Sequence, residues 1–142
     1  MNLVIDEDLM IESRSVNDII VVNLKGDLDA FTVQKVKNQL TQLIENGYRK
    51  IVVNLSRVRY INSTSIGVLV GRLRKLKEYH GELALAELSD RANRVITLVG
   101  GKKLFNIFNT ESEAIDTLAH SEGGRRKVEG GSKKTSFVMS EK

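Results

Sequence analysis

Apolar runs with two different spacings alternate along residues 1–120, and this alternation limits the possible folds more than any other feature of the chain. Residues 51–55, Ile-Val-Val-Asn-Leu, are almost wholly apolar over the length of one strand. Such a run is typical of a central strand that is covered on both faces. Further strand-like runs lie at residues 9–12, 19–24, 83–88 and 104–108. The polar pair Asn17 and Asp18 between the first two suits a hairpin.

Between these runs the apolar spacing is that of helices. Val33, Val36, Leu40, Leu43 and Ile44 fall on one stripe of a helix. The pattern predicts helices at residues 31–44, 63–79, 92–99 and 111–119, and the last of these has Glu111 and Glu113 near its start, where acids are favourable. Strands that alternate with helices predict an α/β fold, with a mixed, mostly parallel sheet of about four to five strands and helices packed on it.

Length and charge divide the chain into two parts. A chain of 142 residues fits one domain, which we place at residues 1–120. Residues 121–142 are basic and rich in Gly, Ser and Lys, and we expect a flexible tail. Six basic and three acidic residues give the tail a charge of +3, so the domain carries only +1 of the total of +4. A nearly neutral domain argues against direct binding of nucleic acid.

The composition also narrows the class of protein. The sequence has no cysteine, no apolar run long enough to span a bilayer and no secretory leader pattern, so we expect a cytoplasmic protein without membrane contact. We expect no cofactor and no metal. The two histidines, His80 and His120, lie in a predicted turn and at the end of the last predicted helix, and neither is placed to activate a serine. The chain therefore does not have the pattern of an enzyme.

The segment after the central strand carries most of the chemistry. Residues 62–65, Asn-Ser-Thr-Ser, are expected to follow a short loop and to open the helix at 63–79, with Asn62 or Ser63 as its N-cap. A helix N-terminus can receive a phosphate on Ser63 or Thr64, because its backbone N–H groups and its dipole attract anions. The residues alone favour a simple cap over a phosphate acceptor. Gly67 and Gly71, four residues apart on one helix face, indicate either close packing or the close approach of another group.

Three segments together resemble the STAS domains of bacterial anti-sigma factor antagonists. They are residues 26–29 (Gly-Asp-Leu-Asp), residues 51–55 and residues 60–67 (Tyr-Ile-Asn-Ser-Thr-Ser-Ile-Gly), and the resemblance extends over residues 9–119 in consistent order and spacing. In that family an Asp-Ser-Ser/Thr-Gly-Leu-Gly motif opens a helix, and its first serine is phosphorylated by an anti-sigma factor that is itself a serine kinase.

The resemblance implies a switch with named residues. Ser63 matches the phosphorylated serine, with Thr64 as the second choice, and Asp29 matches an acidic residue that helps to contact the kinase. The unphosphorylated form would bind the kinase and release a sigma factor, and a PP2C-type phosphatase would restore that form. ATP and metal ions would belong to these partners. The implied partner-binding surface comprises Asp29, Asn62, Ser63, Thr64, Ser65 and Gly67.

Two residues depart from the family motif. Asn62 stands where the family has Asp, which removes a carboxylate that could orient the acceptor hydroxyl. Ser65 stands where the family has Gly, and it supplies a third candidate acceptor. Two other functions stay open from the sequence: a STAS partner-switch module that controls a protein other than a sigma factor, and a sensor domain that binds a ligand or nucleotide.

Overall fold

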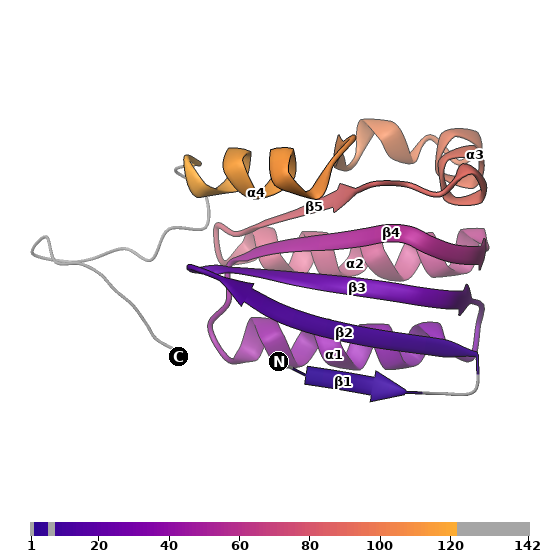
Figure 1. The fold of residues 1–142 in the computed structure, drawn as a ribbon, viewed down its shortest axis with the longest axis horizontal. Coiled ribbons are helices and arrows are strands. Elements are labelled where there is room, and N and C mark those ends of the chain that lie inside the picture. Colours follow the sequence, from indigo (N-terminus) through magenta and orange to yellow (C-terminus); the bar gives the residue numbers. More distant parts are fainter. Residues whose placement is uncertain (1, 6–7, 122–142) are drawn as a thin grey trace, which may run out of the picture.

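The computed structural model of the protein describes residues 2–5 and 8–121, and a six-stranded mixed sheet forms its centre (Figure 1). The sheet order follows the chain: β1 (Asn2–Ile5), β2 (Leu9–Val16), β3 (Ile19–Leu28), β4 (Lys50–Ile61), β5 (Glu82–Ala86) and β6 (Asn106–Phe108). β1, β2 and β3 pair antiparallel, and β3 to β6 pair parallel. The predicted α/β class is confirmed. The sheet has one more strand than expected, because the edge strand β1 is only four residues long and has no clear pattern.

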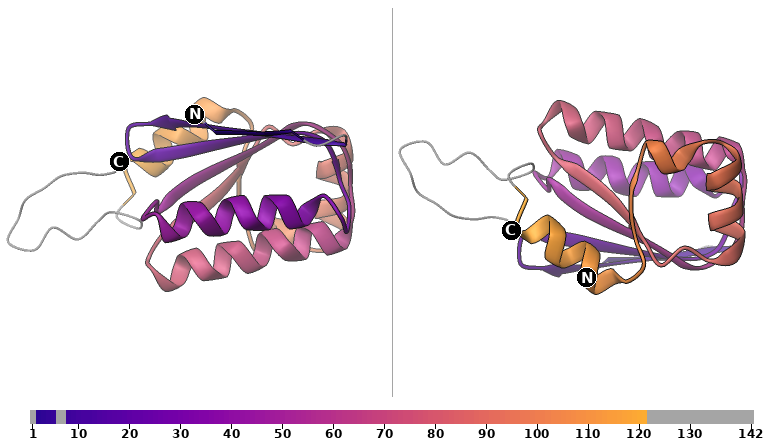
Figure 2. Two further views of the ribbon diagram at one scale, coloured as in Figure 1. Left: turned by 90° about the horizontal axis from the view of Figure 1, so that it is seen from below. Right: turned by 90° about the horizontal axis from the view of Figure 1, so that it is seen from above.

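Four α-helices cover the sheet: α1 (Val33–Glu45), α2 (Ser63–Glu78), α3 (Asp90–Leu98) and α4 (Glu111–Ala119), with a short 3-10 helix, η1 (Gly101–Lys103), after α3. Figure 2 shows α1 and α2 side by side on one face of the sheet and α4 on the other. The larger core lies between the sheet and α1, α2 and α3. A smaller core lies under α4, around Ala114 and Leu118. All four helices predicted from the sequence are present.

β4 is the central strand that the sequence predicts. Ile51 and Val53 belong to the larger core, Val52 belongs to the core under α4, and all three have 0% exposure. Each such side chain contributes about 1.5–3 kcal/mol when it leaves water. The strand therefore holds the two helical layers together.

β4 is much longer than its apolar run, and the predicted short loop before α2 is absent. The strand continues to Ile61, so Asn62 alone separates it from α2. Pairing with β3 carries the strand on, since Leu28 lies opposite Ile61. Apolar periodicity does not predict this extension, because it contains exposed polar side chains such as Arg57 and Arg59.

Gly26 allows β3 to pass close to the start of β2. Its φ of +121° suits glycine, and a Cβ here would lie 2.1 Å from the carbonyl oxygen of Asp8. The next residue, Asp27, donates its N–H to that same oxygen at 2.8 Å. The glycine of the Gly-Asp-Leu-Asp segment is thus required by the fold, and it sets the path of the chain into the turn before α1.

α4 ends at Ala119, and the domain boundary at residue 120 stays a prediction. Residues 122–142 lie outside the described residues, so the predicted tail stays a prediction.

Candidate functional site

Asn62 caps the helix that carries the serine cluster. It has extended backbone geometry, with φ −123° and ψ 174°, and its Oδ1 accepts a hydrogen bond from the N–H of Ser65 at 2.9 Å. This arrangement is an N-cap, and it selects Asn62 rather than Ser63 for that role. The amide thus satisfies the structural part of what a carboxylate at this position could do.

Ser63 and Thr64 are both exposed in the first turn of α2. Neither hydroxyl makes a hydrogen bond to another residue within the described part of the chain. The first turn also contains no acidic residue. Two accessible hydroxyls therefore lie at the positive end of a helix dipole that no carboxylate of this turn offsets.

Ser65 differs sharply from its two neighbours. It has 0% exposure, and its Oγ lies 2.8 Å from the carbonyl oxygen of Leu28 and 2.9 Å from Oδ1 of Asn62. Its hydroxyl is therefore buried and engaged, and the expectation of a third acceptor at Ser65 is wrong. The side chain instead ties the start of α2 to the end of β3.

Asp29 organises the turn between β3 and α1. Its Oδ1 accepts from the N–H groups of Phe31 and Thr32, each at 2.9 Å. These hydrogen bonds hold the pKa of the Asp29 carboxyl below its ordinary value. The bond from the N–H of Thr32 has the largest effect, and the bond from the N–H of Phe31 has the next largest. Oγ1 of Thr32 in turn donates to the carbonyl oxygen of Asp27 at 2.6 Å and accepts from the N–H of Asp29 at 3.0 Å.

The structure brings Asp29 close to the serine cluster, although the two are more than thirty residues apart in the sequence. Asp29 follows Leu28, whose carbonyl faces the hydroxyl of Ser65. Asp29 and Ser63 therefore lie at the same end of the sheet, where the parallel strands end. Sites in α/β folds commonly form at this end.

Gly67 and Gly71 do not pack closely, contrary to one of the two expectations from their spacing. A Cβ on either residue would meet no atom within 4 Å. Gly67 is exposed, and it lies one helical turn beyond Ser63. Gly67 therefore presents no side chain on the surface one helical turn beyond Ser63.

Several features at this end of the sheet could not be found from the sequence. Arg59 pairs with Asp27 at 3.3 Å, and the guanidinium of Arg91, from α3, lies 4.9 Å from the ring centre of Tyr60. Phe31 is 86% exposed in the turn that Asp29 holds. Periodicity could not find these features, because each of the two pairs joins different elements and Phe31 lies in the turn between β3 and α1.

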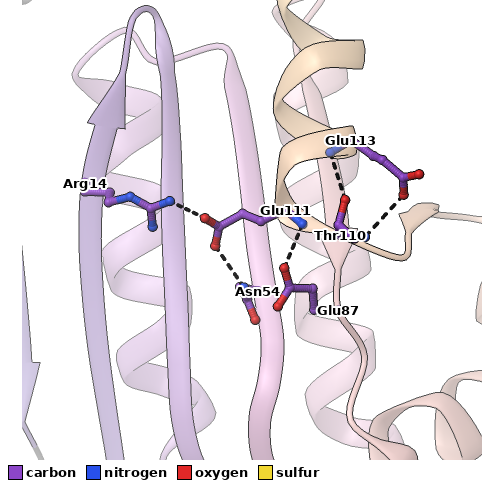
Figure 3. A network of polar contacts seen from close by, with 6 residues as sticks. All are labelled: Arg14, Asn54, Glu87, Thr110, Glu111 and Glu113. Carbon is purple, nitrogen blue, oxygen red and sulfur yellow. Dashed lines mark hydrogen bonds and ion pairs between the residues drawn. The ribbon is translucent and has the colours of Figure 1, made fainter.

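A second polar cluster fixes α4 to the sheet (Figure 3). Glu111 accepts hydrogen bonds from Arg14 of β2 and from Nδ2 of Asn54 of β4, the latter at 2.8 Å. Burial alone would raise the pKa of the Glu111 carboxyl, but the hydrogen bonds from Arg14 and Asn54 and the charge of Arg14 hold it below its ordinary value. Glu87 accepts from the N–H of Glu111 at 2.8 Å.

The described residues offer no group of three or more His, Cys, Asp or Glu side chains that could hold a metal ion. No helix in the described part of the chain has the length and apolar character needed to cross a bilayer.

Comparisons with known proteins agree with this fold. Residues 10–114 match the family model described as "STAS domain". The anti-sigma-B factor antagonist of Staphylococcus aureus is 35% identical over 100 residues, which are 70% of this chain and 93% of that protein.

Two solved structures of SpoIIAA are also similar. The anti-sigma factor antagonist SpoIIAA in its unphosphorylated form has a TM-score of 0.67 and 25% identity, and covers 77% of this chain and 96% of its own. The Bacillus cell fate determinant SpoIIAA in its phosphorylated form has a TM-score of 0.61 and 27% identity, and covers 75% of this chain and 97% of its own.

Proposed function

The chain belongs to the STAS domain family, and from this membership we propose that it is an anti-sigma factor antagonist switched by phosphorylation of Ser63. Relatives that carry the name anti-sigma-B factor antagonist support the first part of the proposal. The phosphorylated form of SpoIIAA supports the second part, because a similar fold accepts a phosphate. The function is regulatory, so the proposal gives the chain no reaction of its own.

One observation carries the choice of residue. Of the three adjacent hydroxyls, Ser65 is fully buried, whereas Ser63 and Thr64 are exposed. Ser63 is also the first residue of α2, directly after the Asn62 cap. The resemblance to the family motif supports an acceptor at this first position, with Thr64 as the second choice.

The switch follows from charge. The kinase transfers the γ-phosphoryl group of ATP to Oγ of Ser63. The new O–P bond forms as the bond between the γ-phosphorus and the β,γ-bridging oxygen breaks, ADP leaves, and the hydroxyl proton passes to a base of the kinase. The product carries a charge of about −1.5 to −2 at neutral pH. The N–H groups and the dipole of α2 favour this anion, so the domain stays folded. The partner surface that accepted a neutral hydroxyl now meets a bulky dianion, and the complex dissociates.

The remaining parts of the proposal complete the cycle. The anti-sigma factor is a serine kinase that binds the unphosphorylated chain and thereby releases a sigma factor. A PP2C-type phosphatase removes the phosphate from Ser63 and restores binding. The contact surface comprises Asp29, Asn62, Ser63, Thr64 and Gly67, with Ser65 as their buried support. The pathway operates in the bacterial cytoplasm, and residues 1–120 are sufficient for it, while residues 121–142 form a basic tail.

Binding of three forms of the chain to the cognate anti-sigma factor tests the proposal. We expect Ser63→Ala to bind as wild type does, because the serine hydroxyl has no partner among the described residues. We expect Ser63→Asp to bind roughly 100-fold more weakly, since unfavourable charge contacts at an interface cost several kcal/mol. Ser15→Asp adds the same charge to an exposed serine near the opposite end of the sheet, so it is the matched control and should bind normally. Equal binding of the Ala and Asp forms at position 63 would refute the switch.

A further inference from the structure

Phe31 is the most exposed of the large apolar side chains in the described part of the chain, at 86%. A single exposed apolar residue is common on protein surfaces and needs no explanation by itself. Phe31 differs in its surroundings, because the turn that carries it is held by several hydrogen bonds. It also lies beside the proposed switch.

The turn holds Phe31 in one place through its backbone. The N–H of Phe31 donates to Oδ1 of Asp29 at 2.9 Å, and Thr32 makes the same contact at 2.9 Å. The N–H of Val33 donates to the carbonyl oxygen of Asp29 at 3.0 Å, which begins α1. An aromatic ring on a fixed backbone loses little conformational freedom when a partner covers it. Aromatic side chains, phenylalanine included, are enriched at protein–protein interfaces.

The Phe31 turn and the Ser63 turn follow neighbouring strands at the same end of the sheet. The hydroxyl of Ser65 lies 2.8 Å from the carbonyl oxygen of Leu28. Leu28 lies three residues before Phe31, and Ser65 lies two residues after Ser63. The backbone pairing of Leu28 with Ile61 fixes the same two segments side by side. A standard interface covers about 800 Å² on each partner, which is enough to include both turns.

We propose that Phe31 is the apolar anchor through which this chain docks on its anti-sigma factor, and that Asp29 is a positioning residue that presents the ring. The inference rests on the proposed function. The partner feature that fits Phe31 is a shallow pocket of apolar side chains, placed where it can close over the ring while the kinase reaches Ser63. Asp29 acts mainly through Oδ1, which holds the turn, and only secondarily through its charge.

This assignment differs from one in which Asp29 contacts the kinase by charge alone, and substitutions separate the two. Asp29→Asn keeps an oxygen that can accept from the N–H groups of Phe31 and Thr32 but removes the charge. Asp29→Ala removes both. Phe31→Ala leaves the Asp29 cap intact and removes only the ring, and Phe31→Tyr keeps an aromatic ring. Leu98→Ala is the matched control, because Leu98 is 79% exposed at the end of α3.

The experiment measures the dissociation constant of each variant for the cognate anti-sigma factor, with thermal unfolding of each variant measured in parallel. We expect Phe31→Ala to weaken binding roughly 30-fold, as truncation of an anchor residue does. Phe31→Tyr and Asp29→Asn should stay within about threefold of wild type, and Asp29→Ala should lose about tenfold or more. Leu98→Ala should bind normally, and Phe31→Ala should unfold at the wild-type temperature.

Two outcomes would overturn the proposal while leaving the switch in place. Normal binding by Phe31→Ala would show that the ring is not an anchor. A loss for Asp29→Asn as large as that for Asp29→Ala would show that Asp29 acts by charge rather than by position. Failure of the wild-type chain to bind the anti-sigma factor would be a different result, and it would overturn the proposed function together with this inference.

Discussion

The N-termini of α2 and α4 are both capped by a side chain, but they differ in the acidic residues around them. At α4, Thr110 and Glu113 form a capping box, Glu111 lies in the first turn, and the carboxylate of Glu87 accepts from the backbone (Figure 3). At α2, the Asn62 amide is the cap, and the first turn contains no acidic residue. Carboxylates of the chain itself lie at the N-terminus of α4, whereas no carboxylate lies in the first turn of α2. The positive end of the α2 dipole is therefore available to another anion, such as a phosphate.

The comparison separates two uses of the same local chemistry. Glu111 joins α4 to Arg14 and Asn54, so its carboxylate stabilises the tertiary structure. Ser63 and Thr64 make no hydrogen bond to any other described residue, so the fold gains little from their hydroxyls. We therefore expect substitutions at the start of α4 to change stability, and substitutions at Ser63 to change binding.

Removal of Glu111 should have the largest effect on stability. Glu111→Ala leaves Nδ2 of Asn54 without its carboxylate, and the Asn54 side chain is nearly fully buried. An unsatisfied buried donor costs about 1–3 kcal/mol, so we expect unfolding to become easier by about 2 kcal/mol. Urea denaturation measures this change. Glu113→Ala, which removes only half of the exposed capping box, is the control and should cost less than Glu111→Ala.

Removal of the α2 cap should have an intermediate effect. Asn62→Ala loses the hydrogen bond from the N–H of Ser65, and helix caps are typically worth about 1 kcal/mol. Asn62→Asp restores the family residue, keeps the acceptor and places a negative charge at the helix N-terminus. It should therefore stabilise the domain by about 0.3–1 kcal/mol. A loss of stability in Asn62→Asp at neutral pH would contradict an open, positive α2 terminus.

The Glu111 contribution should depend on pH. Its pKa lies below the ordinary glutamate value in the folded protein. A depressed pKa stabilises the fold at pH values above the unfolded pKa, and this stabilisation is lost as the pH falls through the folded pKa. The difference in unfolding free energy between wild type and Glu111→Gln should therefore be greatest near neutral pH and should shrink below about pH 4.5. A difference that stays constant from neutral to acid pH would contradict this account.

Ser63→Ala should have the smallest effect on stability. The side chain is exposed and has no hydrogen bond to a described residue, so we expect a change within about 0.5 kcal/mol. Ser65→Ala, measured alongside, should cost about 1–2 kcal/mol because its buried hydroxyl faces the carbonyl of Leu28. A larger loss of stability for Ser63→Ala than for Ser65→Ala would contradict the distinction between an exposed acceptor and a buried support.

Local pattern predicted the elements well, because each needs only its own segment. The apolar run at 51–55 and the stripe at 33–44 predicted the central strand and α1 correctly. The roles of single polar residues depended on distant partners. Ser65 reads as one of three similar hydroxyls until Leu28, 37 residues away, is placed against it. Glu111 reads as an acid at a helix start, and its bond to Arg14, 97 residues away, appears only in the fold.

The central claim is that Ser63, at the open N-terminus of α2, is the phosphate acceptor. Incubation of the wild-type chain with its cognate anti-sigma factor kinase and ATP, followed by mass-spectrometric mapping of the modified residue, tests it most directly. We predict one phosphate on Ser63, and none on the Ser63→Ala variant under the same conditions. A phosphate that maps to Thr64 or elsewhere, with Ser63 unmodified in the wild-type chain, would contradict the claim.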